Sequence, residues 1–165
     1  MTVEWRGKYL EVRRVGTWEF AGRVARMGAA VILAVTEARE IVLVEQFRVP
    51  HGAMSIELPA GLIGDTGDGD TVLAAAAREL AEETGFRAAV WEDLGEFATS
   101  PGMSSEMFNL VRATGLTRFG PGGGVADEEI RVHVVPLDGL AAFLADKRAQ
   151  GCVIDCRLVI AMGLV

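Results

Sequence analysis

The sequence predicts one α+β domain built on a mixed β-sheet with few helices. A length of 165 residues fits a single domain, and a chain of this length buries enough surface to fold without disulfides. Half of its residues are hydrophobic and its mean hydropathy is +0.29, which excludes a disordered chain. Apolar runs of strand length dominate the first half, and the predicted elements do not alternate between strand and helix as in a doubly wound sheet.

The first half of the chain is expected to be mostly extended. The predicted strands, marked by alternating or continuous apolar residues between turn signals, are 9–15, 17–24, 29–35, 40–47 and 55–58. The first two would form a hairpin around Gly16. Residues 1–26 are therefore expected to make an amino-terminal strand arm, and residues 27–165 the remaining domain.

The second half is expected to combine the helices with further strands. A loop of small and acidic residues, 61–70, leads into a helix over 71–84, which Asp70 would cap and Gly85 would end. The remaining predicted strands are 88–97, 107–113 and 128–135, and the remaining predicted helices are 137–150 and 155–164. The glycine-rich segment 120–124 is expected to be a flexible loop.

Charge and hydropathy exclude several classes of protein. The chain carries 23 acidic and 16 basic residues, a net charge of −7. Nucleic-acid partners are disfavoured, because their affinity comes mainly from Lys and Arg on phosphates. No apolar run approaches about 18 residues, so neither a transmembrane helix nor a membrane partner is expected. The amino-terminal residues lack the apolar core of a signal peptide, and we therefore expect a cytoplasmic protein.

Three glutamates near the end of the first predicted helix form the most informative pattern. Glu79, Glu82 and Glu83 are spaced i, i+3 and i+4, and so share one helix face. Like charges at this spacing repel each other. A hard divalent cation such as Mg²⁺ or Mn²⁺, which prefers oxygen ligands, would compensate. The pattern alone leaves two interpretations open, a metal site and a solvated acidic face.

The residues around these glutamates resemble the Nudix box. Residues 78–86 read Arg-Glu-Leu-Ala-Glu-Glu-Thr-Gly-Phe and match the carboxyl-terminal part of the box at fixed spacing. Asp70 stands where the box has glutamate, and Gly64 falls on its leading glycine by count. In the string Glu-Leu-Pro-Ala-Gly at 57–61, however, Gly61 corresponds to that glycine. We interpret the box as starting at Gly61, with three residues inserted in the loop.

The resemblance implies a fold, a reaction and a set of ligands. The implied fold is an α/β/α sandwich with a mixed sheet, and the implied reaction is hydrolysis of a nucleoside diphosphate linked to another moiety. The implied ligands of Mg²⁺ or Mn²⁺ are Glu79, Glu82, Glu83 and the backbone carbonyl of Ala60. Arg78 joins Glu82 and Glu83 in the implied catalytic set. Metals on the diphosphate oxygens would neutralise charge and activate water for attack on phosphorus.

Further motifs are similar to one branch of the family, the ADP-ribose pyrophosphatases. Pro101 lies 16 residues beyond the last glycine of the box, a spacing that marks this branch. The strings at 45–48, 57–61 and 127–136 are similar to the branch as well, so the resemblance spans residues 17–165. It implies Mg²⁺-dependent hydrolysis of ADP-ribose or a related ADP-sugar to AMP and a sugar phosphate. Two alternatives remain: a pyrophosphatase for another nucleotide sugar such as GDP-mannose, and a non-catalytic module that binds ADP-ribose.

The resemblance also implies substrate contacts for individual residues. For each of them a purely structural role is the alternative. Arg48 resembles the arginine that contacts the diphosphate, or it is a solvated strand end. Trp18 resembles an aromatic residue that stacks on the adenine, or it packs in the core or an interface. Arg23 would contact the same nucleotide or face solvent. Pro101 would belong to the substrate site or only make a tight turn, and Glu57 would support the metal through water or form a salt bridge.

The general base is implied by a second acidic segment. Glu128 resembles the loop glutamate that deprotonates the attacking water, with Glu129 or one of the box glutamates as alternatives. The glycines at 120–124 would let this loop close over the substrate. The branch usually dimerises through exchanged amino-terminal strands, so a homodimer with the arm as a contact is expected.

Overall fold

The computed structural model describes residues 1–25, 28–64, 70–125 and 128–165. Its strands are β1 (Thr2–Arg6), β2 (Leu10–Val15), β3 (Trp18–Arg23), β4 (Ala29–Ala34), β5 (Glu40–Arg48), β6 (Ala53–Glu57), β7 (Ala60–Leu62), β8 (Phe86–Ala98), β9 (Met107–Arg118), β10 (Arg131–Pro136) and β11 (Val153–Ile154). Its α-helices are α1 (Val72–Thr84), α2 (Leu140–Ala149) and α3 (Cys156–Ala161), and its 3-10 turns are η1 (Leu137–Gly139) and η2 (Met162–Leu164).

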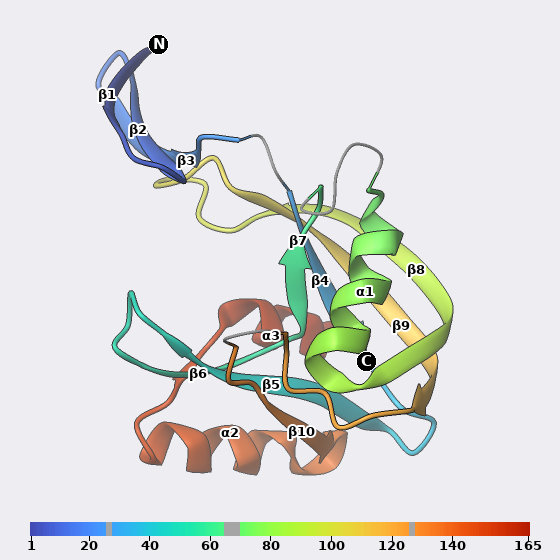
Figure 1. Cartoon of the computed structure of the whole chain (residues 1–165). Helices are drawn as coiled ribbons and strands as arrows, with labels where there is room; N and C mark the ends of the chain where they lie inside the picture. Colours follow the sequence, from blue (N-terminus) through green and yellow to red (C-terminus); the bar gives the residue numbers. More distant parts are fainter. Residues whose placement is uncertain (26–27, 65–69, 126–127) are drawn as a thin grey trace.

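Two four-stranded sheets form the body of the molecule (Figure 1). The first has the order β7-β4-β9-β8 and the second the order β10-β5-β6-β11. Both are mixed, because β4 runs parallel to β9 and β6 parallel to β11, while their other pairs are antiparallel. Helix α1 packs on the first sheet and α2 on the second. The predicted mixed α/β fold with few helices is therefore confirmed.

Strand β4 separates two hydrophobic clusters, and this explains the layering. Val31 and Leu33 belong to the cluster that includes residues of α2 and α3. Ala30, Ile32 and Ala34, which alternate with them, belong to the cluster that includes α1. The α1 residues in that cluster are Ala75, Ala76 and Leu80. A strand buried on both faces accounts for the continuous apolar run in the sequence, and it places helices on both sides of the sheets.

The amino-terminal strands form a separate antiparallel sheet, β1-β2-β3, that extends away from the body (Figure 1). The predicted hairpin is confirmed as β2 and β3. Strand β1 was not predicted, although Val3 and Trp5 alternate with polar residues as in a strand, and all five of its residues are exposed. Two backbone hydrogen bonds join β3 to the body: the Ala21 N–H donates to the Met103 carbonyl and the Ser105 N–H to the Ala21 carbonyl, both at 2.9 Å. The boundary after residue 26 stays a prediction, because Arg26 and Met27 lie outside the described residues.

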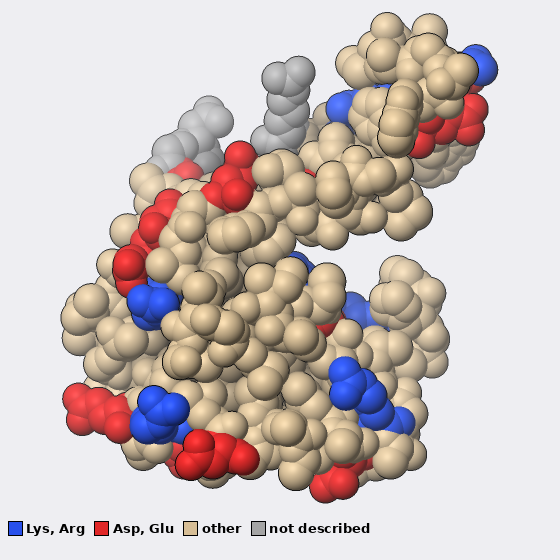
Figure 2. Space-filling view, turned by 180° about the vertical axis from the view of Figure 1, so that it is seen from behind, with Lys and Arg blue, Asp and Glu red and all other residues tan. Residues whose placement is uncertain are grey.

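The space between the arm and the body is visible from behind. In Figure 2 the surface is hollowed there, and charged side chains can be seen inside the hollow. The surface that surrounds the hollow is mostly uncharged in this view.

The start of α1 differs from its prediction. Its N-cap is Thr71, whose Oγ1 accepts the N–H of Ala74 at 3.2 Å, so the expectation that Asp70 caps the helix is wrong. Asp70 instead uses its carboxylate to accept the N–H of Gly64 at 3.1 Å. Gly85 ends the helix as predicted, with φ +71° and its N–H donated to the carbonyl of Ala81.

Other differences come from pairing between distant segments. Strands β7 and β11 were not predicted, because they have only three and two residues. Strand β7 forms by pairing with β4, and β11 forms by pairing with β6. Strand β10 begins at Arg131 rather than at 128. The predicted helix over 155–164 is α3 followed by η2, and Asp155 caps it by accepting the N–H of Arg157.

No helix among the described residues has the length and apolar character needed to cross a membrane.

Candidate active site

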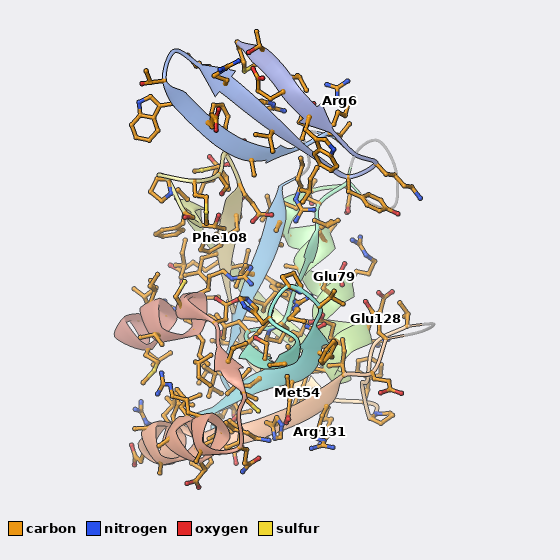
Figure 3. The ribbon with its side chains drawn as sticks, turned by 90° about the vertical axis from the view of Figure 1, so that its left-hand side faces the viewer. Arg6, Met54, Glu79, Phe108, Glu128 and Arg131 are labelled. Atoms are coloured by element: carbon orange, nitrogen blue, oxygen red, sulfur yellow. The ribbon has the colours of Figure 1, made fainter. Side chains whose placement is uncertain are left out.

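One large cleft, of about 1030 Å³, contains most of the predicted site residues. Glu79, Glu82 and Glu83 of α1 line it together with Glu128, which lies just before β10. We call these four side chains the acidic wall. Figure 3 shows Glu79 and Glu128 on the same side of the molecule, reached from α1 and from the loop below it. The structure therefore brings the box glutamates and the predicted base to one cavity, whereas Glu129 is not among the residues that line it.

Glu83 is the most deeply placed member of the acidic wall, with 5% of its surface exposed. Its Oε2 accepts the backbone N–H of Ala60 at 3.0 Å. Burial raises the pKa of the Glu83 carboxyl from 4.5 to about 8; the Ala60 hydrogen bond opposes the shift, and the charges of Glu79 and Glu128 add to it. A carboxylate in this position therefore favours a proton or a cation beside it.

Glu79 shows the same behaviour to a lesser degree. Burial raises its pKa, Arg78 opposes the shift, and the charges of Glu82 and Glu128 raise it further. A Cβ atom at Gly61 would fall inside the Glu79 carboxyl group, whereas a Cβ at Gly64 would meet open space. This close approach supports Gly61 as the glycine that begins the box. Residues 65–69 of the intervening loop lie outside the described residues.

Arg78 connects the loop before α1 to the acidic wall. Its Nη1 donates to Asp70 Oδ2 at 3.0 Å, and its Nη2 donates to the Leu62 carbonyl and to Glu79 Oε1, both at 3.2 Å. Arg78 thus positions Glu79, and Asp70 serves as its anchor. The aspartate in place of the usual box glutamate is accounted for by these contacts, because the shorter acid reaches both Arg78 and the backbone of Gly64.

The acidic wall fits a hard divalent cation by its chemistry. All of its donors are carboxylate oxygens, the ligands that Mg²⁺ and Mn²⁺ prefer, and a cation would offset the burial and like-charge repulsion that raise the pKa values of Glu79 and Glu83. Ala60 lies beside Glu83 through the N–H bond, which places its backbone at the site. Across the ranges that the structure describes, no group of three or more His, Cys, Asp or Glu side chains is close enough to hold an ion as placed. The carboxylates must turn toward a common point to bind one.

Two arginines from distant segments line another part of the cleft. Arg48, at the end of β5, donates Nε and Nη2 to the two carboxylate oxygens of Glu57, both at 2.7 Å. Arg157 of α3 approaches the same carboxylate at 3.5 Å and donates its Nε to Asp155 at 2.7 Å. These bonds to Glu57 raise the pKa of Arg48. Of the two interpretations of Glu57, the structure shows the salt bridge.

Arg157 is an arginine of the cleft that sequence reasoning missed. Nothing near it in the sequence marks a site, because it joins the cleft only when α3 folds back beside β6. The one local signal is the Asp155–Arg157 spacing at the helix start, which reads as an ordinary cap. Arg48 and Arg157 are called the arginine pair below.

The remaining predicted substrate residues divide between two places. Arg23, at the end of β3, lines the cleft and forms an ion pair with Glu106 at 2.6 Å. Trp18, at the other end of β3, is 63% exposed and lines a separate pocket of about 420 Å³ together with Pro101. The structure therefore brings Arg23 and Arg48 to the same cleft as the acidic wall, and it places Trp18 and Pro101 together but outside that cleft.

The fold and the acidic helix define a Nudix hydrolase. A sequence model of the NUDIX domain matches residues 25–153, so the chain belongs to this family. Nudix hydrolases generally use divalent metal ions, in agreement with the carboxylate donors.

Several characterised proteins are similar to this chain. A methanol dehydrogenase activator of Bacillus methanolicus is 31% identical over 179 residues, which covers 94% of this chain and 93% of that protein. A GDP-mannose pyrophosphatase of Cronobacter sakazakii is 37% identical and covers 81% of this chain and 70% of that protein. An ADP-ribose pyrophosphatase of Mycobacterium tuberculosis is 39% identical, over 59% of this chain and 46% of that protein. Among solved structures, an ADP compounds hydrolase superposes with a TM-score of 0.68 at 23% identity, over 87% of this chain and 80% of that one, which confirms the fold.

Proposed function

We propose that this protein hydrolyses the diphosphate of ADP-ribose or a related ADP-sugar to AMP and a sugar phosphate, with Mg²⁺ as the metal. The observation that supports it most is one cleft that combines four carboxylates with the arginine pair. The negative charge of a diphosphate is stabilised by nearby cations. The cleft offers two sources of positive charge, a metal ion held by the acidic wall and the guanidinium groups of the arginine pair. ADP-ribose pyrophosphatases among the relatives support the substrate class.

The metal would be held by Glu79, Glu82, Glu83 and the carbonyl of Ala60. There it would neutralise charge on the diphosphate oxygens and lower the pKa of a bound water. Glu128 would accept the proton of the attacking water as its oxygen bonds to phosphorus and the bridging P–O bond breaks.

The cationic residues of the cleft would orient the substrate. The bond pattern between Arg48 and Glu57 uses Nε and Nη2, which leaves the Nη1 edge of the guanidinium for the diphosphate. Arg23 would contact the nucleotide, once it exchanges part of its pairing with Glu106. Arg78 would act by holding Glu79 rather than by touching the substrate.

The amino-terminal arm would form the contact with a second copy of the chain in a dimer. Its large exposed apolar residues are Met1, Val3, Trp5, Tyr9, Leu10, Val15 and Trp18. Such a surface on a projecting sheet is suited to dimerisation. We propose a homodimer in which Trp18 stacks on a purine near the shared interface, and the cytoplasm expected from the sequence as the location.

A second substrate is favoured by a specific observation. GDP-mannose pyrophosphatases match more of this chain than the ADP-ribose pyrophosphatases do, 81% against 59% for one of each. Stacking on Trp18 would accept guanine as well as adenine. The two substrates require the same carboxylates and arginines, so the choice between them depends on contacts with the base and the sugar.

Product analysis tests the proposal. The purified protein is incubated with ADP-ribose, with GDP-mannose and with a nucleoside triphosphate, each with Mg²⁺ and each with an excess of chelator. AMP from ADP-ribose, absent with chelator and in Glu83→Gln, supports the proposal, and GMP from GDP-mannose at a higher kcat/KM supports the alternative. Glu37→Gln is the matched control, because Glu37 is exposed in the turn before β5 and does not line the cleft. Tight binding of ADP-ribose without any turnover would instead indicate the non-catalytic module.

A further inference from the structure

The glycine-rich segment after β9 is attached to the end of α1. The sequence predicted a flexible loop here, but the backbone N–H of Gly123 donates to the carbonyl of Glu83 at 2.8 Å. The next N–H, that of Gly124, donates to the carbonyl of Glu82 at 3.1 Å. We call residues 122–125 the glycine strap. It satisfies carbonyl groups at the carboxyl end of the helix, and these belong to two members of the acidic wall.

The same strap holds the loop that carries Glu128. The carbonyl of Gly123 accepts the N–H of Ile130 at 3.3 Å, which joins the two ends of that loop. Within the loop, the Val125 N–H donates to Glu128 Oε2 at 3.0 Å, and the Glu128 N–H donates to the Val125 carbonyl. One residue, Gly123, is therefore bonded through its N–H to the helix that carries Glu83 and through its carbonyl to the base of the loop that carries Glu128.

Position 124 accepts only glycine without displacing Glu128. Its φ is +83°, in the left-handed region that L side chains rarely adopt. A Cβ atom there would lie 2.6 Å from Glu128 Oε2 and 2.7 Å from Glu128 Cβ. By contrast, Gly123 has φ +116° but its Cβ would meet nothing closer than 3.8 Å, and Gly120 has open space and no positive φ.

We infer that the glycine strap is a positioning element for catalysis, which fixes the carboxylate of Glu128 relative to Glu82 and Glu83. This inference rests on the proposed function, since Glu128 acts as a general base only if the cleft hydrolyses a diphosphate. The strap acts through hydrogen bonds and space, not through contact with substrate. A change at Gly124 should move the base and leave the helix glutamates where they are.

Three glycine-to-alanine variants separate this role from general strain. Gly120→Ala adds a methyl group in open space, Gly123→Ala adds backbone strain, and Gly124→Ala adds strain together with overlap on Glu128. We expect kcat to fall roughly 10- to 100-fold in Gly124→Ala with KM changed by less than about threefold, because a base displaced by about 1 Å loses that much rate. Gly120→Ala should stay within about twofold of the wild type. Binding of Mn²⁺, measured by calorimetry, should be the same in all three.

A double-mutant cycle supplies the decisive readout. If Gly124 acts through Glu128, then Gly124→Ala combined with Glu128→Gln should be no slower than Glu128→Gln alone. Multiplicative losses of kcat, an active Glu128→Gln, or a Gly124→Ala variant as active as the Gly120→Ala control would overturn the inference. A wild-type protein that turns over none of the nucleotide sugars would refute the proposed function itself, which is a distinguishable result.

Discussion

Replacing Glu83 by glutamine should stabilise the metal-free protein and abolish its activity. The side chain is 5% exposed, and burial raises its pKa to about 8 from 4.5. Glutamine keeps an oxygen that can accept the Ala60 N–H, and it removes the ionisable group. The variant therefore isolates the free energy of holding this carboxylate in the acidic wall.

The sign and size follow from the shift in pKa. Because the folded-state pKa lies above the unfolded one, the folded chain retains a proton that the unfolded chain releases, and stability is lost as the pH rises from 4.5 toward 8. One pKa unit corresponds to about 1.4 kcal/mol. Between pH 5 and pH 8, Glu83 should thus cost the wild type on the order of 3 kcal/mol of unfolding free energy, and the variant should be free of this loss.

Urea unfolding at pH 5 and pH 8, with chelator present, measures the effect. The quantity compared is the difference in unfolding free energy between wild type and Glu83→Gln at each pH, since shifts at other groups cancel. Mg²⁺ at pH 8 should then stabilise the wild type more than the variant. If the unfolding free energies of the two proteins depended equally on pH, the pKa of Glu83 would not be raised in the folded state. The assignment of a metal site to the acidic wall would then lose its main physical support. Glu37→Gln should behave as the wild type.

Three further substitutions test other parts of the site. Glu82→Gln should lower kcat for the preferred nucleotide sugar by about 100-fold or more and leave the melting temperature nearly unchanged, because it removes a proposed metal ligand and relieves like-charge repulsion; wild-type kcat would contradict the role. Arg48→Lys should raise KM about tenfold with a smaller effect on kcat, since lysine cannot pair with both oxygens of Glu57; an unchanged KM would place the diphosphate elsewhere. Thr71→Ala should lower the unfolding free energy by about 1 kcal/mol without changing kcat, because it removes the N-cap bond to Ala74. Chemical denaturation measures this loss, and an unchanged unfolding free energy would contradict the capping role.

The acidic helix could be predicted from the sequence because its information is local. The spacing of Glu79, Glu82 and Glu83 defines a helix face without reference to the rest of the chain. The same is true of β4, whose continuous apolar residues require burial on both sides. The cap was predicted wrongly as Asp70, because Asp70 and Thr71 are both good N-cap residues and the sequence does not show that Asp70 pairs with Arg78.

The parts of the site that could not be predicted depend on segments far apart in the chain. Arg157 meets Glu57 across 100 residues, and nothing in the sequence near either residue indicates the pair. Trp18 and Pro101 were assigned to the substrate site from resemblance, and the structure places them in a second pocket outside the cleft of the acidic wall. The glycines at 120–124 looked like a hinge, because the sequence does not show that their N–H groups meet the end of α1.

The small residues between α1 and β4 have a consequence for how such proteins diversify. Ala75 and Ala76 are fully buried in the same hydrophobic cluster as Ala30 and Ala34 of β4, so the packing of α1 on β4 leaves little room for larger side chains. Any lineage that keeps the chemistry must keep this contact close to its present form. Elsewhere in the cleft, Pro50 and His51 lie in the turn after β5 and Thr99 in the loop after β8, where substitution costs less. Changes in the sugar or base that is accepted should therefore accumulate there, while the reacting centre stays constant.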